Sequence, residues 1–567
     1  MPKKPRPRFL MMSFSIVAML LLMLSACGGG GSSSSTSNTS AGTPVKGGTW
    51  IDDLYEEPDS LLPNASNETF AAMVDYALYA PTVYGTPQGQ MTPGLVTQVP
   101  TVADGGVSAD LKTVTYHFKS GLVWSDGQPL DARDMDFTWK LWGNPKFGAI
   151  QTVNNLNIAS ADVSSDNLTI TFHLKNPQVS FVANWVDGYY APMPAHLYSS
   201  MDPASILKSS NNLNPSVVSG PFMMSEVKPN DHYTVVRNPK YYQAAQGLPY
   251  LDKLVFRIIP DQNTILKDLQ AGTVDSAWFL DVSKTIAYQS LHDYKLTADP
   301  NTYSFEALYF NFKNKVLANN PEVRKAMAMV VDQQTLIQVA RRGQGGILCT
   351  DHTKTQNPGF TVGLTCPQMK PDATGANSLL DQAGWVKGSD GVRTKNGQRL
   401  EFQYSTTAGN LWRSDDQLIN QTAFKGIGIK MDIQNYPAST LFGSFLTDAK
   451  PGVYDVVEYA TSNTYDPDDS ALFQCNVPSN TTYYCNPQMD AQYKAEQSSG
   501  VASVRQQAFN AIHQIELTDV PFIVEFANPD IGIYRLGTHN YSPSLLGIGS
   551  TENVWEWWCD NGTCPAS

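Results

Sequence analysis

The sequence predicts an α/β protein with two or more lobes. Two observations support this prediction: the order of strand and helix segments, and the length of the chain. Segments with the alternation of a strand and segments with the periodicity of a helix are interspersed along the chain, as in α/β and α+β proteins. The chain has 567 residues. Roughly 520 of them remain after an N-terminal leader and linker, which is more than one hydrophobic core holds.

Three segments have the composition of strands. KTVTYHFK (112–119) and NLTITFHLK (167–175) alternate apolar with polar residues, which is typical of half-buried strands. PFIVEF (521–526) is a short run of mostly apolar residues. We therefore expect a strand in each of the three.

Three other segments have the signals of helices. DARDMDFTWKLW begins with Asp131 at the N-cap position and has Asp134 three residues later, the order of a capping box. NPEVRKAMAMVVDQQTLIQVA (320–340) has Pro321 at the first helical position. SVRQQAFNAIHQIELTD (503–519) repeats apolar residues at helical spacing. We expect one helix in each segment.

The N-terminus has the features of a secretory signal. Its first ten residues carry four cations and no acid, and an apolar run from Phe9 to Leu24 ends in LSAC. That ending resembles a bacterial lipobox, in which Cys27 becomes the lipidated N-terminus. A Gly/Ser-rich stretch follows, which is typical of a flexible tether. We predict a signal peptide over 1–26 and a tether over 27–45; a short transmembrane anchor is the alternative.

The charge of the chain disfavours two classes of partner. Removing the signal takes away four cations and no acid, so the formal charge moves from −13 to −17. An acidic protein is a poor ligand for nucleic acid or anionic lipid. The 26 tyrosines, 23 phenylalanines and 11 tryptophans suit an adaptable binding surface.

Six cysteines remain beyond Cys27, and an even number outside the cytoplasm predicts disulfides. Proximity in the sequence favours one set among the fifteen possible pairings. The expected pairs are Cys349–Cys366, Cys475–Cys485 and Cys559–Cys564. A zinc site would need CxxC or paired histidines, and neither occurs.

The chain lacks the common signatures of catalysis. HExxH, GxSxG, GxxxxGK[ST] and GxGxxG are absent, and the eight histidines form no i,i+3 or i,i+4 pair. The acidic stretch TSNTYDPDDSALFQC (461–475) has Ala471 and Val477 where a calcium-binding EF-hand needs Gly and Glu. We expect no metal and no cofactor, and nothing in the sequence requires an enzyme.

Many segments, in order, resemble the family 5 bacterial solute-binding proteins, the dipeptide, oligopeptide and nickel group. The run GLVWSDGQPLDARDMDFTWK (121–140) resembles the family signature most closely. The resemblance extends from about residue 46 to the C-terminus. Its other blocks are KGGTW (46–50), EEPDSLLPN (56–64), APMPAHL (191–197), SGPFMMSEVKPNDHYTVVRNPKYY (219–242), LQAGTVDSAW (269–278), ALYFNFKN (307–314), PEVRKAMAMVVD (321–332), LLDQAGWVKGSDGVR (379–393) and GIGIKMDIQNY (426–436).

The resemblance implies a two-lobed periplasmic-binding-protein fold (type II, cluster C) with an extra smaller domain and a hinge between the lobes. Ligand contacts to both lobes would shift the hinge toward a closed state. The boundaries that follow are lobe I over 46–79, 197–303 and 530–567, the extra domain over 80–196, and lobe II over 304–529.

The same resemblance indicates where a ligand would bind. In peptide-binding members an acid four residues before the proline of a loop in one lobe holds the ligand's α-ammonium. With Pro467 as that proline, the position is Asn463. An amide can accept a hydrogen bond from an ammonium but cannot neutralise its charge. Either Asp466 takes this role, or the ligand lacks a free amino terminus.

Further residues that would line the ligand-binding site are predicted in this loop and in two other segments. Tyr465 lies in the loop itself, and Trp412 and Arg413 begin a predicted helix, where a guanidinium can bind a carboxylate. Tyr303 and Glu306 lie near the expected crossover between the lobes. Exposed surface positions are the alternative for Trp412 and Arg413.

Together these features predict a monomeric, lipid-anchored, extracytoplasmic receptor that delivers peptides to an ABC permease. An oligosaccharide ligand is the alternative within the family, and nickel or heme lacks clustered histidines to support it. A secreted hydrolase using the acidic stretch, or a sensory receptor, are the alternatives from other classes.

Overall fold

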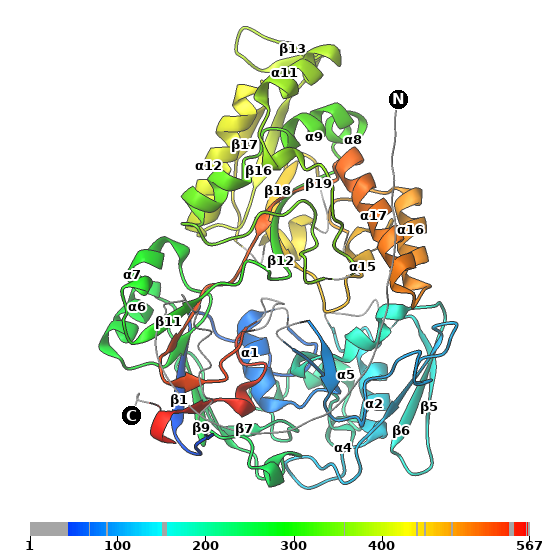
Figure 1. Ribbon diagram of the computed structural model, residues 1–567, viewed down its shortest axis with the longest axis vertical. Coiled ribbons are helices and arrows are strands. Elements are labelled where there is room, and N and C mark those ends of the chain that lie inside the picture. Colours follow the sequence, from blue (N-terminus) through cyan, green and yellow to red (C-terminus); the bar gives the residue numbers. More distant parts are fainter. Residues whose placement is uncertain are drawn as a thin grey trace, which may run out of the picture. The chain divides into compact units, whose positions relative to one another are not determined.

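The computed structural model describes residues 43–66, 68–86, 89–149, 156–356, 358–437, 440–446, 450–477, 480–543, 549–562 and 564. The chain divides into two units, residues 1–43 and residues 44–567. The predicted signal peptide, Cys27 and the tether up to residue 42 lie outside the described residues. All helices and strands below belong to the second unit (Figure 1).

The first large sheet is mixed and has the order β11-β20-β10-β1-β9-β8-β7. Strand β1 pairs in parallel with β9 and β10, whereas β7, β8 and β9 are antiparallel neighbours. Helix α1 (Thr69–Leu78) packs its apolar residues on this sheet, and α6 (Gln262–Ala271) and α7 (Thr285–Gln289) contribute a second apolar cluster. The strands are β1 (Thr49–Leu54), β7 (Phe222–Lys228), β8 (His232–Arg237), β9 (Lys253–Ile258), β10 (Ser276–Ala277), β11 (Tyr294–Thr297) and β20 (Gly532–Arg535).

The second large sheet has the order β17-β16-β18-β12-β19 and is covered on both faces. Alternate residues of β12 face opposite sides. Leu308 packs in a core with α9 (Pro321–Ala328), α11 (Ala373–Gln382) and α12 (Leu411–Gly426), while Ala307 packs in another with α17 (Ala502–Asp519). The strands are β12 (Ser304–Phe310), β16 (Glu401–Ser405), β17 (Lys430–Ile433), β18 (Val456–Ser462) and β19 (Phe522–Ala527).

A three-stranded sheet of order β4-β6-β5 lies between β1 and β7 in the sequence. Its core contains α2 (Ala132–Trp142) and several buried rings, among which Trp142 stacks on Trp185 with 5.1 Å between centroids. The strands are β4 (Thr113–His117), β5 (Ile158–Val163) and β6 (Thr169–Leu174).

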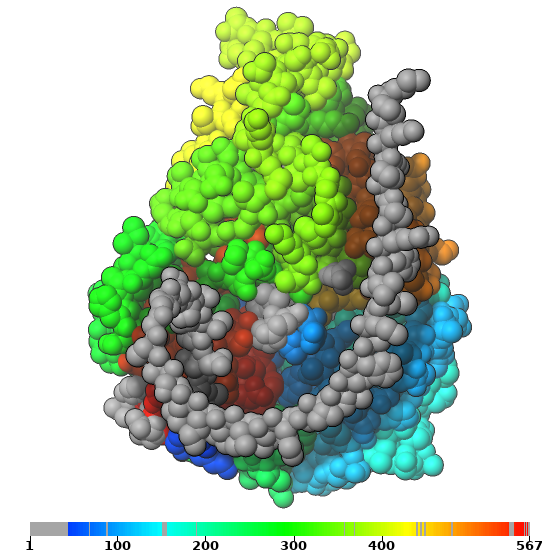
Figure 2. All heavy atoms as spheres, viewed as in Figure 1, coloured from blue at the N-terminus to red at the C-terminus, as the bar shows by residue number. Residues whose placement is uncertain are grey.

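The remaining elements are short, except for α16, which has 11 residues. Figure 2 shows the segment that holds β13 to β15 at the molecular surface, and the residues of β13 and β15 are exposed. The strands are β2 (Val83–Gly85), β3 (Met91–Pro93), β13 (Val386–Lys387), β14 (Arg393–Lys395), β15 (Gln398–Arg399), β21 (Thr538–His539) and β22 (Trp558–Cys559). The helices are α4 (Ala195–Tyr198), α5 (Pro203–Ile206), α8 (Lys315–Asn319), α10 (Gln333–Thr335), α15 (Ser470–Phe473) and α16 (Pro487–Gln497).

The local predictions mostly agree with the structure. The three predicted strands are confirmed as β4, β6 and β19, and α2 begins with a capping box between Asp131 and Asp134. The single helix predicted over 320–340 is wrong. Helix α9 ends at Ala328, and the Asp332 side chain accepts a hydrogen bond from the Thr335 amide to start a new helical turn. Asp332 therefore acts as an N-cap in the middle of the predicted helix.

The six cysteines pair as neighbours in the sequence: Cys349–Cys366, Cys475–Cys485 and Cys559–Cys564. Within the described residues, none of the helices is both long and apolar enough to cross a bilayer. The chain passes from the first large sheet to the second between β11 and β12, and returns between β19 and β20.

Candidate functional site

Asn463 lies in the loop after β18. Its side-chain nitrogen is hydrogen-bonded, whereas its side-chain oxygen is not bonded to any described residue. Its backbone N–H donates to the carbonyl of Tyr303 at 3.1 Å, and its Nδ2 donates to the carbonyl of Asp351 at 2.9 Å. Because a carbonyl can only accept, the nitrogen must face Asp351. The Oδ1 atom is buried and accepts no hydrogen bond within the described residues. A buried acceptor in this state is a place for an N–H or O–H donor.

Two aromatic rings flank the same loop. Tyr465 and Tyr303 are both buried, with ring centroids 6.3 Å apart in an edge-on arrangement. The Tyr465 ring lies against Gly85 at the end of β2, so closely that a Cβ at Gly85 would overlap it. Glycine is therefore required at residue 85 by close approach, and the loop of β18 contacts the segment that precedes the three-stranded sheet.

Asp466 forms a buried ion pair with Arg505 of α17. The guanidinium donates to both carboxylate oxygens, at 2.9 and 2.5 Å, and also to Glu496 of α16 at 2.7 and 2.9 Å. Burial raises the pKa of Glu496 to about 9. The charge of Asp466 is thus already balanced inside the protein, so a ligand ammonium would have to compete with Arg505 for it.

Arg413 and Glu306 form a second bidentate pair. Arg413, in the first turn of α12, donates to the two oxygens of Glu306 at 2.8 and 3.1 Å and to Thr407 at 2.9 Å. Asn528 donates to the same carboxylate at 3.1 Å. Glu306 is fully buried and the Arg413 side chain is 12% exposed, so this ion pair lies inside the protein. The alternative that Arg413 is an exposed surface residue is therefore wrong.

Trp412 contacts two arginine side chains through its ring and is not a freely exposed surface residue. It is half-buried, with the Arg341 guanidinium 4.5 Å from its ring centroid and that of Arg413 at 4.9 Å. Both distances are within the range of cation–π attraction. Its ring also contacts Phe526 of β19 edge-on. Trp412 therefore holds two arginines in place beside Glu306.

Glu306 belongs to a set of acids on one face of the second large sheet. In the register of the sheet, Glu306 of β12 and Glu458 of β18 share the face that α12 covers. Glu525 lies at an irregularity in the pairing of β19 and reaches the same face, where it contacts Asn420 of α12. Glu458 accepts a hydrogen bond from Tyr404, and Glu525 accepts one from Asn420 of α12 at 2.6 Å.

Burial is the main influence on these acids. It raises the pKa of Glu306, against the opposing attraction of Arg413. It raises the pKa of Glu458 to about 8, where the nearby Glu306 adds to the effect. It raises the pKa of Asp416, on α12, well above its usual value, and lowers the pKa of Arg341 to about 10. This face therefore contains carboxyl groups that favour the neutral form beside two arginines.

We expect stability to fall as pH rises through the range in which Glu458 titrates. Its carboxyl has a pKa of about 8 in the folded protein against 4.5 unperturbed. Between those values the folded state binds more protons at Glu458 than the unfolded state, so the contribution of Glu458 to the free energy of unfolding decreases with pH and levels off above about 8. Glu458→Gln should flatten this decrease, as judged from the melting temperature at pH 5 and pH 8.

The matched control is Glu401→Gln, since Glu401 is partly exposed and its hydrogen bonds from Arg399 hold the pKa of its carboxyl below the usual value. It should leave the difference between the two melting temperatures as in the wild type. An equal difference in Glu458→Gln and wild type would contradict the assignment of the titration to Glu458.

Sequence reasoning missed Glu458, Glu525, Asp416 and Arg341. A signal was present for two of them, because VVEY and FIVEF each place one glutamate inside an otherwise apolar strand. A charged residue in a strand buried on both faces needs a partner. The partners on α12 and the cation of Arg341 come from distant segments, and no local pattern links them.

The family model of the bacterial extracellular solute-binding proteins, family 5 (middle region), matches residues 91–483. The chain belongs to this family. Its members are solute-binding proteins, and the extracellular location is part of the family's description.

Relatives of this family 5 protein span almost the whole chain. The oligopeptide-binding protein AppA of Bacillus subtilis is 24% identical over 527 residues, which is 92% of this chain and 93% of that protein. The structure of AppA in complex with a nonapeptide superposes with a TM-score of 0.78 at 21% identity, covering 92% of this chain and all of that one. NikZ of Campylobacter jejuni, in complex with Ni(L-His), gives a TM-score of 0.76 at 21% identity, covering 90% and 99%.

These likenesses show the two-lobed family 5 fold. The two large sheets, with the three-stranded sheet as an additional element, are the mixed α/β content of that fold. The family 5 fold accommodates ligands as different as a peptide and a nickel chelate. The residues that contact the ligand must therefore be argued from this chain itself.

Proposed function

We propose that this protein is a lipid-anchored receptor that captures peptides outside the cytoplasmic membrane and delivers them to an ABC permease. Cys27 is the proposed lipid attachment site, and residues 27–45 the tether. The protein acts as a monomer that closes around its ligand by rotation at the crossings between the two large sheets. The names of its relatives support a peptide as the ligand.

The observation that carries the ligand site is the free Oδ1 of Asn463. It is a buried acceptor that no described residue satisfies, in a loop that also holds Tyr465 and contacts Tyr303. A peptide supplies both complements, since its backbone offers N–H donors and its side chains pack on aromatic rings. Asn463, Tyr465 and Tyr303 are therefore the proposed contact residues. Trp412, Arg413 and Glu306 are further residues of the proposed binding wall, and Asp466 holds the loop.

The charges of these residues also predict how the ligand's amino terminus is bound. Asn463 is neutral, and the charge of Asp466 is balanced by Arg505. Among the described residues of this loop, none offers the free carboxylate that would make a charge-assisted bond of about 1.5–3 kcal/mol to an ammonium. We propose that the ligand is gripped by neutral hydrogen bonds, so that a blocked amino terminus is tolerated.

Mass spectrometry of ligand released from the purified, denatured protein tests this function. We expect peptides, and we expect acetylation of their amino termini to change the dissociation constant by less than about threefold, because no charge-assisted bond is lost. Asn463→Leu should weaken binding about tenfold, as measured by calorimetry, since it removes one hydrogen bond and its acceptor.

Asn214→Leu is the matched control, because Asn214 is an exposed asparagine of the segment before β7. It should bind as the wild type does. Release of an oligosaccharide or a metal chelate would overturn the peptide assignment. A loss of tenfold or more on acetylation would overturn the neutral amine site, and Asp466→Asn would then show whether Asp466 binds the ammonium.

A further inference from the structure

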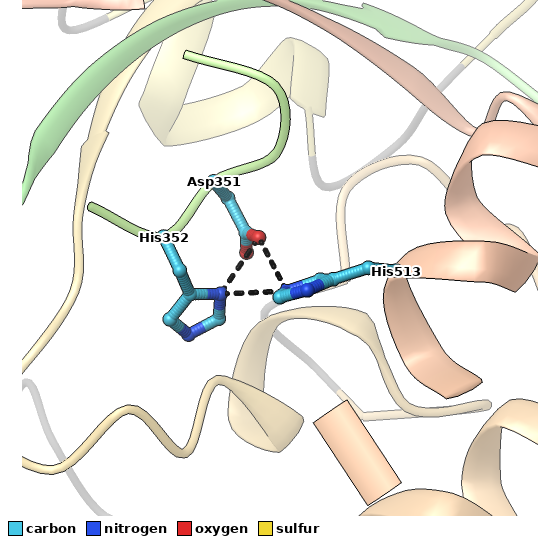
Figure 3. Close-up of side chains that lie close together, drawn as sticks. All are labelled: Asp351, His352 and His513. Atoms are coloured by element: carbon cyan, nitrogen blue, oxygen red, sulfur yellow. Dashed lines mark hydrogen bonds and ion pairs between the residues drawn. The ribbon is translucent and has the colours of Figure 1, made fainter. Parts of the chain in front are cut away.

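Two histidines that are 161 residues apart in the sequence meet beside a buried aspartate. His352 lies in the loop closed by the Cys349–Cys366 disulfide, and His513 lies on α17. Nδ1 of His352 is 3.0 Å from Nε2 of His513 and 2.9 Å from Oδ1 of Asp351 (Figure 3). Nε2 of His513 is 3.6 Å from the same oxygen. All three side chains are fully buried.

The outer hydrogen bonds of the two rings fix which nitrogens carry protons. Nε2 of His352 is 2.7 Å from the carbonyl of Pro467, which can only accept, so this nitrogen is an N–H donor. Thr361 donates its hydroxyl proton to Asn510 at 2.7 Å, so its oxygen accepts from Nδ1 of His513 at 2.8 Å.

In the neutral rings, the two inner nitrogens therefore carry lone pairs. These lone pairs and a carboxylate oxygen converge on one point. Three acceptors at these distances repel one another unless a proton or a metal ion lies among them. Metal-binding histidines characteristically donate their outer N–H to a carbonyl or another oxygen, as both rings do here.

The size of the triangle suits a metal ion. Its sides are 2.9, 3.0 and 3.6 Å. A point slightly out of its plane is about 2.0 Å from all three atoms, the length of bonds from zinc to imidazole nitrogen and carboxylate oxygen.

Two more carboxyl groups, those of Asp469 and Glu516, surround this group, and Asp469 interacts with Asp351 and with the Tyr493 hydroxyl. Oxygens of Asp351, Asp469 and Glu516 lie within 4.8 Å of one another. Both oxygens of Glu516 are buried and accept no hydrogen bond in the described part of the chain. No lysine or arginine among the residues that the structure describes forms an ion pair with them. An ionised carboxylate at this depth is costly without a partner, and a divalent cation would provide one.

We propose that Asp351, His352 and His513 bind a divalent transition-metal ion, with Asp469 and Glu516 as the surrounding carboxylates. Two imidazoles and a carboxylate favour zinc or a neighbouring ion such as nickel or cobalt over calcium or magnesium. The ion joins the disulfide loop to α17. It also fixes the loop after β18, because Pro467 binds His352 and Asn463 binds the Asp351 carbonyl. The proposal does not depend on the identity of the transported ligand.

The test uses the untagged wild-type protein after treatment with a chelator. We expect it to take up one equivalent of Zn²⁺ in a calorimetric titration at pH 7, with a melting temperature raised by a few degrees. With Co²⁺ in place of Zn²⁺, X-ray absorption should show imidazole nitrogens in the coordination shell. A protein without stoichiometric uptake, or without nitrogen ligands to cobalt, would overturn the proposal and leave a proton shared among the three groups.

His513→Gln should lower the affinity for Zn²⁺ at least tenfold. The matched control is His173→Gln, because His173 also pairs with an aspartate, Asp162 at 2.9 Å, but is 41% exposed. It should bind Zn²⁺ as the wild type does. Equal affinity in His513→Gln and the wild type would overturn the site. If His513→Gln does not fold, the cobalt spectrum of the wild type decides.

Discussion

Replacing Arg505 by methionine is expected to lower the free energy of unfolding by about 3–5 kcal/mol, the cost of removing one partner from a buried ion pair. The guanidinium binds Asp466 and Glu496 together, and both lose their partner in the variant. Denaturation by urea, followed by the shift in midpoint, measures the effect. Because Asp466 shares its loop with Asn463 and Tyr465, ligand affinity should fall as well.

Arg399→Met is the matched control for this prediction. Arg399 also binds two acids, Asp390 at 2.6 Å and Glu401 at 2.8 Å, but it is 39% exposed on β15. Exposed pairs contribute roughly 0–1 kcal/mol, so the midpoint should move little. Equal shifts in the two variants would mean that the Arg505 pair contributes no more than a surface pair.

Arg413→Met is expected to have the second large effect, again about 3–5 kcal/mol of stability. It leaves the Glu306 carboxylate on a sheet face shared with Glu458 and Glu525, and among the described residues Asn528 is its remaining side-chain donor. It also removes one of the two cations that hold Trp412. We therefore expect a loss of ligand affinity in addition to the loss of stability, measured by calorimetry on the folded variant.

Two further variants separate the ion pair from the loss of side-chain volume. In Glu306→Gln/Arg413→Met, the neutral amide still accepts the Asn528 hydrogen bond and no unpaired charge remains, so part of the stability should return. Arg342→Met is the exposed control, since Arg342 is 40% exposed and lies 3.5 Å from Asp415. A double variant as unstable as Arg413→Met alone would contradict the ion-pair explanation.

Local features of this protein could be predicted from the sequence because their causes are local. The capping box of α2, the strands β4, β6 and β19, and the pairing of neighbouring cysteines each depend on residues a few positions apart. The prediction of one helix over 320–340 was wrong for a local reason as well. Asp332 was placed inside that helix, although its side chain competes for a backbone amide and starts a new turn.

The residues around the candidate site show where prediction from sequence stops. Asn463 was found because its chain position could be aligned with a family pattern, but the partners of its neighbours could not be found in that way. Arg505 is 39 residues from Asp466, and Arg413 is 107 residues from Glu306. Pairs of residues this far apart in the sequence cannot be inferred from local sequence patterns.

The sequence by itself determined the family, the α/β class, the strand and helix segments and the neutral residue at position 463. Tertiary structure alone decided that Asp466 and Glu306 are balanced by arginines, and that His352 and His513 meet beside Asp351. The physical reason is the distance along the chain over which each interaction acts. Capping and alternation act over a few residues, whereas burial brings charges from distant segments into a low-dielectric interior, where each must find a partner.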